Sequence, residues 1–441
     1  MNTIDINSQF QDAFTRIETT DANLFITGKA GTGKSTFLTY FREKTTKKTV
    51  VLAPTGVSAL NVKGETIHSF FWFDPKITIE SAISAAKKRK NNTIFKELDV
   101  IIIDEISMVR ADLLDCMDVY LKTSLKNEAP FGGKQIVFIG DLYQLPPVVT
   151  SAEKKYFEDV YESPYFFSST SFTQKDVNMS FIELKKVYRQ QDDHFIDILN
   201  AVRTRTVTSD HINTLNKHHI PNCEEHDIGY VYLTSTNASA DIINASKLEK
   251  ILAPDYRFSA IVSGKFTIKP PTDRHLVLKV GAQVMFLNND AAGRWVNGTI
   301  GTLTEIDDDE DEIGVTLPNG KTVSVHPHKW DLSKYIYDRA SRTLTQESIG
   351  SFTQYPLRLS WAMTIHKSQG KTFDNVIIDL ERGSFATGQT YVALSRCRSL
   401  GGLRFKHPIK KSHILLDGRI VTFLMGYADQ RHERLSLPRS M

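Results

Sequence analysis

Short apolar runs alternate with amphipathic or polar stretches over the first third of the chain. The runs lie within residues 24–27, 50–62, 99–108 and 130–148, and each ends in a turn or a polar cluster. Continuous β-branched runs of this kind are typical of parallel strands that are covered on both faces. Alternating strand and helix signals predict a parallel sheet with crossover helices. We therefore expect an α/β core that ends near residue 183.

A second α/β region is expected from residue 184 onward, with a strand over residues 230–238. Helix patterning fades after about residue 296, where short β runs and the hairpin signal Asn319-Gly320 take over. We therefore expect a small β insertion at residues 297–356. The second core is then formed by residues 184–296 and 357–441.

The bulk composition is typical of a folded, water-soluble protein with several domains. A chain of 441 residues exceeds one ordinary core, and a prior of roughly 100–200 residues per domain predicts about two to four domains. Hydrophobic residues make up 41% and charged residues 24%, which excludes disordered and fibrous classes. The formal net charge of +3 excludes a histone-like, purely electrostatic nucleic-acid binder and by itself predicts no partner.

Neither secretion nor membrane insertion is expected from the sequence. The N-terminus lacks the cationic start and the apolar run of a signal peptide, and no apolar stretch reaches about 18 residues. The three cysteines are widely spaced, at Cys116, Cys223 and Cys397. This spacing predicts neither a disulfide framework nor a four-cysteine zinc site, and a reducing compartment fits best.

Two clusters of chemically active side chains are interpreted as structural. His218, His219, Cys223 and His226 have metal-ligand chemistry, but no second cysteine accompanies them and we expect no structural zinc. The acidic run at residues 307–312 separates two β runs. It could repel DNA or receive a basic partner, but a solvated hairpin tip explains it better.

A glycine-rich segment follows the first apolar run directly. It reads GKAGTGKS over residues 28–35 and leads into a helical-looking stretch. The pattern G-x-x-x-x-G-K-[ST] wraps backbone N–H groups around phosphates, puts the Lys34 ammonium on the β and γ phosphates and offers the Ser35 hydroxyl to Mg²⁺. An ordinary glycine-rich turn is the alternative, but the strand and helix flanks favour an ATP site. The candidate ATP-binding residues are Gly28, Gly31, Thr32, Gly33, Lys34, Ser35 and Thr36.

The run at residues 99–108 ends in two adjacent carboxylates, Asp104 and Glu105. Asp104 is placed to hold Mg²⁺, directly or through water, and Glu105 to orient and deprotonate the attacking water. Adjacent residues of a strand point to opposite faces, so both can reach the site only if the strand has ended there. Two solvated acids at a strand end are the alternative, which the phosphate loop upstream disfavours.

Five further segments point to a motor rather than to a simple nucleotide binder. They are VVLAPTGVSALNV with GETIHSFF (50–71), PFGGKQIVFIGDLYQLPPV (130–148), LKKVYRQ (184–190), MTIHKSQGKTFDNVIIDL (363–380) and GQTYVALSRCRSL (388–400). In this order they resemble superfamily-one helicases, and most closely the petite integration frequency (PIF) helicases, over about residues 9–405. Phage Dda and RecD-type helicases have a similar motif order.

The resemblance implies an α/β protein with two RecA-like parallel-sheet cores that clamp ATP between them. The first core would cover residues 1–183, with a small wedge or pin insertion at about residues 66–95. The second core would carry a small Src-homology-three-like β-barrel over residues 297–356.

The resemblance also assigns roles around the γ phosphate. Gln144 resembles the glutamine that senses this phosphate, and Arg189 and Arg396 resemble arginine fingers supplied by the second core. A guanidinium suits this role because its fixed, always-charged fork can meet several phosphate oxygens. Gly370 is expected beside the γ phosphate, with Gln369 near it.

The adenine of ATP and the DNA track are assigned in the same way. Gln9 resembles an adenine-reading glutamine, with Gln11 as the alternative register. Hydroxyls, amides and backbone N–H groups suit phosphates, and aromatic faces suit stacked bases. The segments that resemble DNA contacts are Pro54-Thr55-Gly56, His68-Ser69-Phe70, Thr236-Asn237, and Thr364 with His366, Lys367 and Ser368. In the apolar quartet at residues 70–73 most side chains are expected to pack, while one or two face a base.

The sequence therefore predicts an ATP- and Mg²⁺-dependent helicase that travels 5′ to 3′ on single-stranded DNA and opens forks, with the direction implied by the resemblance alone. An RNA-directed ATPase and a nucleotide-switched remodeller on DNA without strand separation are the alternatives. We expect a monomer in free solution, no membrane association, and a bacterial or phage-host cytosol with nucleoid association.

Overall fold

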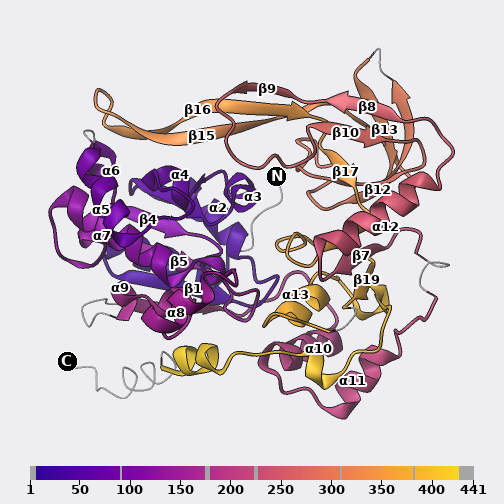
Figure 1. The fold of residues 1–441 in the computed structure, drawn as a ribbon, viewed down its shortest axis with the longest axis horizontal. Helices are drawn as coiled ribbons and strands as arrows, with labels where there is room; N and C mark the ends of the chain where they lie inside the picture. The colour runs from indigo at the N-terminus through magenta and orange to yellow at the C-terminus, as the bar shows by residue number, and fades with distance from the viewer. Residues whose placement is uncertain are drawn as a thin grey trace. The chain divides into compact units, whose positions relative to one another are not determined.

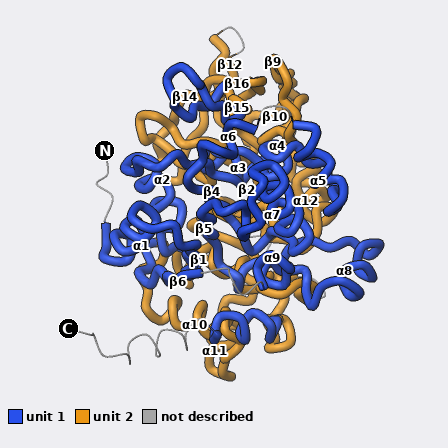
Figure 2. The backbone as a smooth tube through the Cα atoms, turned by 90° about the vertical axis from the view of Figure 1, so that its left-hand side faces the viewer, with its two compact units in different colours: residues 1–188, 333–347, 416–441 blue, residues 189–332, 348–415 orange. Residues whose placement is uncertain are grey.

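The chain folds into two compact units, which the computed structural model describes over residues 6–89, 92–173, 179–222, 227–307, 310–380 and 383–426 (Figures 1 and 2). The first unit comprises residues 1–188, 333–347 and 416–441, and the second comprises residues 189–332 and 348–415. The division therefore differs from the expected boundaries, because two distant segments complete the first unit.

The first unit is built on a parallel sheet with strand order β3-β2-β4-β5-β1-β6. Its strands are β1 (Asn23–Gly28), β2 (Thr49–Ala53), β3 (Glu65–Thr66), β4 (Val100–Ile103), β5 (Gln135–Ile139) and β6 (Met179–Leu184). The four apolar runs at the start of the chain thus form the predicted strands. The expected core boundary at residue 183 falls inside the edge strand β6.

Alternating side chains of these strands supply two apolar layers. Leu24 and Ile26 face the layer formed with α1 (Ser8–Thr19) and α2 (Lys34–Lys44), while Phe25 faces the layer formed with α5 (Ile79–Lys88) and α7 (Ala111–Leu125). The sheet is thus covered on both faces, as its uninterrupted apolar strands require. Shorter helices of the first unit are α3 (Gly56–Asn61), α4 (Ile67–Phe71), α6 (Thr93–Glu97), α8 (Lys154–Val160) and α9 (Thr170–Thr173).

The tip of a long hairpin, residues 333–347, packs on the β3 edge of the first sheet. The Tyr335 hydroxyl accepts a hydrogen bond from the Val51 backbone N–H at 3.1 Å. The backbone N–H of Tyr335 donates to Glu65 Oε2 at 3.2 Å. The Tyr335 ring lies 6.2 Å from that of Phe70. Because an open strand edge invites unwanted pairing, this contact also protects the sheet.

Residues 418–426 are helical and return to the first unit from the far end of the described chain. Phe423 stacks on Phe167 with ring centroids 4.3 Å apart, and Ile420 is fully buried in the same apolar layer. These apolar contacts explain why this segment groups with the first unit rather than with the second core, in which the sequence placed it.

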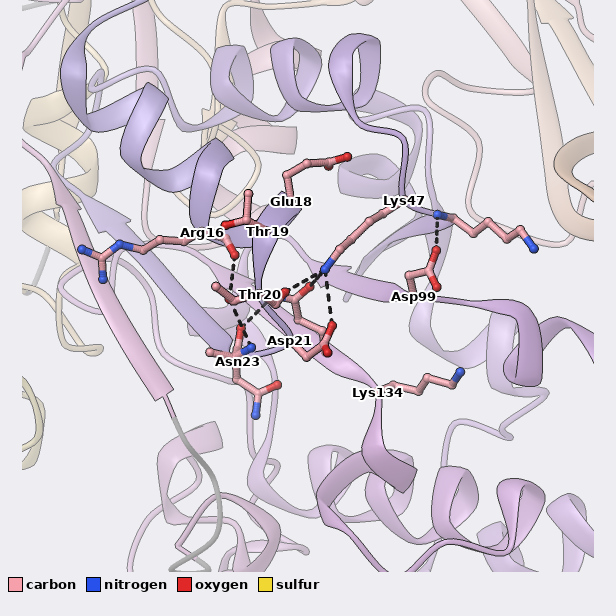
Figure 3. Close-up of polar contacts among 12 residues, drawn as sticks. Arg16, Glu18, Thr19, Thr20, Asp21, Asn23, Lys47, Asp99 and Lys134 are labelled. Atoms are coloured by element: carbon pink, nitrogen blue, oxygen red, sulfur yellow. Dashed lines mark hydrogen bonds and ion pairs between the residues drawn. The ribbon is translucent and has the colours of Figure 1, made fainter.

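The amino ends of the first sheet are tied together by polar contacts around Lys47 (Figure 3). The Lys47 ammonium donates to the Thr20 carbonyl at 2.7 Å and to Gln135 Oε1 at 3.0 Å, and it lies 3.6 Å from Asp21. Lys48 N–H donates to Asp99 nearby. This network fixes the loops at the amino ends of the strands. The carboxyl ends of the strands remain for ligands.

The second unit contains a parallel sheet with strand order β18-β7-β19-β20. Its strands are β7 (Val231–Thr234), β18 (Ala362–Thr364), β19 (Val376–Asp379) and β20 (Leu403–Phe405). Its helices are α10 (Asp193–Thr204), α11 (Ser209–Asn216), α12 (Asn237–Glu249) and α13 (Gln389–Ser395). The strand expected over residues 230–238 is the shorter β7, and residues from Asn237 onward belong to α12.

An antiparallel sheet, β14-β13-β12-β11-β17, interrupts this second core. It comprises β11 (Gln283–Phe286), β12 (Ile300–Asp307), β13 (Glu312–Thr316), β14 (Thr322–Val325) and β17 (Leu357–Leu359), and the neighbouring strands are β8 (Tyr256–Ser259), β9 (Ile261–Gly264), β10 (His275–Leu278), β15 (His328–Asp338) and β16 (Thr343–Gln354). Asn319-Gly320 forms the predicted β13–β14 turn, with Gly320 at φ +78°. Strands β15 and β16, of 11 and 12 residues, are longer than the short runs expected.

Candidate functional site

The carboxyl ends of three adjacent strands bring the predicted nucleotide residues of the first unit together. β5 pairs with β1 on one side and with β4 on the other. The phosphate loop follows β1, Asp104 and Glu105 follow β4, and Asp141 with Gln144 follow β5. This shared edge is where parallel α/β sheets hold their ligands.

The phosphate loop has the backbone that its glycines predict. Gly31 and Gly33 have φ of +79° and +84°, and Gly33 is the residue that caps helix α2. Lys34, the first residue of that helix, donates from Nζ to the Gly28 carbonyl at 2.7 Å and to the Lys29 carbonyl at 3.1 Å. Its ammonium therefore lies within the loop, close to the helix N-terminus that attracts phosphate.

The two carboxylates leave the strand in different conformations. β4 ends at Ile103, and Glu105 adopts a left-handed backbone with φ +52°. The expectation that the strand has ended at this pair is therefore confirmed. Burial and the neighbouring Glu105 charge raise the pKa of Asp104, which the Lys34 ammonium partly opposes. A buried carboxylate with a raised pKa, together with the hydroxyl of Ser35 at the start of α2, fits a divalent cation such as Mg²⁺, which would restore the charged form.

Gln144 belongs to a compact turn after β5. Its backbone N–H donates to the Asp141 carbonyl at 3.0 Å, and its side-chain amide lies 3.4 Å from Asp141 Oδ2. Both side chains are buried, Asp141 completely. This burial disfavours the reading of Gln144 as an ordinary solvent-facing glutamine.

Tyr188 lies beside the phosphate loop, and Gln9 lies at the end of β6. The Gln9 amide donates to the Glu183 carbonyl at 2.7 Å and accepts from the Lys185 N–H at 2.9 Å. The Tyr188 N–H donates to the Gly31 carbonyl at 2.8 Å, and its ring lies close enough to contact a Cβ placed on Gly33. Sequence reasoning missed Tyr188, although an aromatic residue next to a candidate finger arginine was the available signal.

In the second unit, the two candidate arginine fingers meet at the end of helix α13. Arg189 Nη1 donates to the Ser395 carbonyl at 3.1 Å, and Arg396 Nη2 donates to Ser395 Oγ at 2.8 Å. Arg396 follows the last helical residue and is buried, with Nε donating to the Val392 carbonyl at 2.9 Å. The structure thus brings Arg189 and Arg396 together within one unit.

The Arg396 side chain also reaches the segment that carries Gly370. Its Nη1 donates to the Lys371 carbonyl at 3.3 Å. Gly370 has φ +80°, with open space around a Cβ placed there. Burial lowers the pKa of Lys371 to about 8, and its ammonium donates to Asn297 Oδ1 at 2.6 Å. The candidate γ-phosphate residues of the second unit are therefore neighbours.

The candidate DNA residues of the first unit follow two adjacent strands. Leu52 and Ala53 of β2 pair with Glu65 and Thr66 of β3. Pro54, Thr55 and Gly56 therefore lie beside the segment that leads to His68, and the Thr55 side chain caps helix α3 by accepting from the Ser58 N–H. Burial lowers the pKa of His68, and the charge of Arg110 adds to this effect.

The candidate DNA residues of the second unit have the same placement. Thr364, the last residue of β18, pairs with Thr234 of β7. Thr236 caps helix α12, whose first residue is Asn237, and His366, Lys367 and Ser368 come after Thr364 in a turn. Here too burial lowers the pKa of the histidine, His366.

Three members of the aromatic quartet at residues 70–73 are core residues. Phe70, Phe71 and Phe73 are buried, whereas Trp72 is 59% exposed. Packing of most of the quartet is therefore confirmed. The ring of Phe70, a candidate DNA contact, is covered by Phe71, Phe95 and the hairpin tip.

Two other sequence features have different outcomes. Cys223 and His226 of the possible zinc cluster lie outside the described residues. The acidic run joins β12 to β13, with Asp307 paired to Glu312, so the predicted hairpin is confirmed.

Within the described part of the chain, no helix is long and apolar enough to cross a membrane.

The chain is similar to proteins of a known helicase family. The family model described as PIF1-like helicase matches residues 5–213. The ATP-dependent DNA helicase Pif1 of Bdellovibrio bacteriovorus is 33% identical over 415 residues, covering 91% of this chain and 88% of the relative. The chain belongs to the PIF1-like helicase family. The resemblance of the motif segments is thus confirmed along nearly the whole chain.

Solved structures of PIF1-like helicases support the fold. Bacteroides sp. Pif1 in complex with ADP-AlF4 matches with a TM-score of 0.87 at 36% identity, covering 96% of this chain and 97% of that one. Bacteroides Pif1 bound to single-stranded DNA matches with a TM-score of 0.66 over the same shares, again at 36% identity. The predicted α/β fold with parallel-sheet cores is therefore confirmed.

Proposed function

We propose that this chain is an ATP-dependent DNA helicase that moves 5′ to 3′ on single-stranded DNA and unwinds duplex DNA. Helicase activity driven by ATP follows from its family. One observation supports the assignment above the others: the phosphate loop, the Asp104-Glu105 pair and Gln144 share one sheet edge. Such an edge can bind a triphosphate, hold Mg²⁺ and sense the γ phosphate at once.

Within this proposal each polar group of the ATP site has one task. Lys34 neutralises the β and γ phosphates, Ser35 and Asp104 hold Mg²⁺, and Glu105 orients the attacking water. Arg189 and Arg396 stabilise the negative charge that develops on the transferred phosphate. The remaining proposed ATP contacts are Gln9, Gly28, Gly31, Thr32, Gly33, Thr36 and Gly370.

The proposed DNA track runs over the capped turns that follow adjacent strands in each unit. In the first unit it comprises Pro54, Thr55, Gly56 and His68, together with the backbone of Phe70, whose ring is covered by the core. In the second unit it comprises Asn237, Thr364, His366, Lys367 and Ser368. Backbone N–H groups, hydroxyls and neutral imidazoles suit phosphates without selecting a sequence, as translocation requires. We further propose that residues 66–95 form the wedge and residues 297–356 the barrel insertion.

The remaining proposals concern the setting of the protein. Single-stranded DNA and forks are the proposed partners, with a monomer in free solution and no structural zinc. A bacterial or phage-host cytosol with nucleoid association is the proposed location. The free, buried thiols of Cys116 and Cys397 support a reducing compartment.

Tailed duplexes test both the activity and its direction. The purified chain is given ATP, Mg²⁺ and DNA duplexes that differ only in carrying a 5′ or a 3′ single-stranded tail. We expect separation of the 5′-tailed duplex and little of the 3′-tailed one. Preference for the 3′ tail would contradict the direction, and stronger stimulation of ATPase by RNA than by DNA would favour an RNA-directed enzyme. DNA-stimulated ATPase without strand separation would favour the remodeller.

A further inference from the structure

Trp72 is an exposed aromatic residue in an otherwise buried segment. It follows helix α4 directly and is 59% exposed, whereas the residues on either side, Phe71 and Phe73, are 0% and 6% exposed. Its backbone is left-handed, with φ +60° and ψ +40°. A bulky residue in this conformation costs free energy, and such outliers gather at functional positions.

The backbone of Trp72 is tied to the proposed DNA track. Its N–H donates to the Ser69 carbonyl at 3.2 Å, and the next N–H, of Phe73, donates to the His68 carbonyl at 2.7 Å. Trp72 therefore keeps a fixed position relative to His68, one helical turn away.

A guanidinium lies over the indole ring of Trp72. The Arg89 guanidinium carbon lies 4.2 Å from the Trp72 ring centroid and 4.7 Å from that of Phe95, so the two rings enclose it. Arg89 Nη1 donates to the Phe70 carbonyl and to the Tyr120 hydroxyl, both at 3.2 Å, which holds the cation in place.

A second cation comes from the hairpin tip. Lys334 Nζ lies 5.7 Å from the Trp72 ring centroid. The charges of Lys334 and Arg89 both act on the carboxyl group of Glu65, which is buried and accepts hydrogen bonds from Ser69 Oγ and the Tyr335 N–H. Two cations therefore lie over the exposed indole ring, while the carboxylate of Glu65 is buried.

We propose that Trp72 is a stacking platform for a base of single-stranded DNA, and that Lys334 attracts the phosphate of the same nucleotide. An exposed indole beside two cations suits a stacked base with its anionic backbone, and stacking does not depend on sequence. The covered ring of Phe70 cannot offer such a face without opening the core. This inference deepens the proposed function and rests on it, since it adds a base contact to the same track.

Intrinsic fluorescence can report this contact, because the other three tryptophans are buried. Trp295, Trp330 and Trp361 are 6%, 8% and 9% exposed. The full chain is titrated with oligothymidylate of about 16 nucleotides, close to the upper site size of single-strand binders. Binding is followed in parallel by the anisotropy of a labelled oligonucleotide. We expect saturable quenching of tryptophan emission with the same Kd as the anisotropy gives.

Substitutions at Trp72 separate stacking from folding. Trp72→Gly removes the ring, and glycine accepts a φ of +60° without strain, so the turn is kept. We expect its affinity for the oligonucleotide to fall about tenfold or more. Trp72→Phe keeps an aromatic face and should stay within about twofold of the parent affinity while losing the quenching. Tyr156→Ala, an exposed aromatic residue of the same unit, is the matched control and should change neither quantity.

The role of Lys334 has its own readout. Lys334→Gln should make the dependence of log K on log salt concentration shallower by about 0.7, the contribution of one phosphate contact on a single strand. Saturable anisotropy with unchanged emission in the parent chain would overturn the Trp72 contact. Parent-like affinity of Trp72→Gly, or parent-like quenching in Trp72→Phe, would overturn it as well. Absence of a saturable anisotropy change would overturn the proposed DNA binding as well. That result is therefore distinguishable from failure of the Trp72 contact alone.

Discussion

The two units carry the same tripeptide, Thr-Ile-His, at the same place in their sheets. Residues 66–70 read Thr-Ile-His-Ser-Phe at the end of β3, and residues 364–368 read Thr-Ile-His-Lys-Ser at the end of β18. Both strands lie at a sheet edge, both isoleucines are fully buried, and burial lowers the pKa of both histidines. The threonine hydroxyl accepts a backbone N–H in each case, from Ser69 and from Lys367.

The two segments diverge after the histidine. In the first unit the histidine lies within helix α4, and the buried Phe70 and Phe71 that follow join this helix to the apolar layer. In the second unit the chain turns at once toward Gly370, and the Lys371 carbonyl accepts from Arg396. The same histidine turn is thus anchored to the core in one unit and to the candidate arginine finger in the other.

The largest effect should come from the finger on the second unit. Arg189→Ala should lower kcat for ATP hydrolysis at least about 10³-fold, because the charge that develops on the phosphoryl group loses its cation, while ATP still binds. Steady-state ATPase and a fluorescent nucleotide titration measure the two quantities. Arg257→Ala, an exposed arginine of the same unit, is the matched control. Turnover at the parent rate by Arg189→Ala would refute its role as a finger.

The phosphate-loop lysine of the first unit should show a smaller but still large loss. Lys34→Ala should reduce kcat/KM for ATP about 10²-fold or more and abolish unwinding, because the β and γ phosphates lose their cation. Binding of single-stranded DNA without nucleotide should remain, as measured by anisotropy. Lys44→Ala, at the exposed end of the same helix, is the control and should unwind normally. Unwinding by Lys34→Ala would contradict the assignment of the ATP site.

The first unit should also depend on its distant C-terminal segment. Phe423→Ala should destabilise this unit by about 2–3 kcal/mol, below the usual range for a fully buried phenylalanine because Phe423 is only half-buried. Hydrogen exchange should quicken in β1 and β5 while β7 and β19 stay protected. Met425→Ala, 61% exposed in the same helical stretch, should leave exchange unchanged. Equal loss of protection in both units would speak against a local role.

The smallest effect concerns the two histidines. Their pKa values lie below the ordinary value of about 6.5, so both imidazoles are neutral at pH 7. Their charge appears only as the pH falls through the lowered pKa, and it would then add attraction to phosphate. We expect DNA affinity at fixed salt to be constant within about twofold from about pH 7 to 8 and to rise below about pH 6. The rise should be smaller in His68→Gln and in His366→Gln, and an undiminished rise in both would exclude them as its source.

Local pattern was sufficient for most of the parallel sheets. The apolar run at residues 99–103 became β4, and Asn319-Gly320 became a hairpin turn, because each signal depends on neighbours in sequence. The phosphate loop and the carboxylate pair each follow a predicted strand. They could be placed together because parallel strands align their carboxyl ends.

Long-range packing could not be predicted from these patterns. Nothing in the periodicity around Tyr335 or Phe423 indicates that the two residues complete a sheet built from residues 23–184. Their partners are chosen by surface shape and by open strand edges, which exist only after the sheet has formed. The exposure of Trp72 between two buried phenylalanines is likewise decided by three-dimensional packing, because all four aromatic residues look alike as a run.

The return of residues 418–426 to the first sheet has a consequence for biosynthesis. The strands of that sheet leave the ribosome first, yet Phe423 and Ile420 are made more than 200 residues later. At roughly 5–20 residues per second, the nascent sheet waits on the order of tens of seconds with an apolar face incomplete. During this interval the unfinished first unit is a natural client for a chaperone.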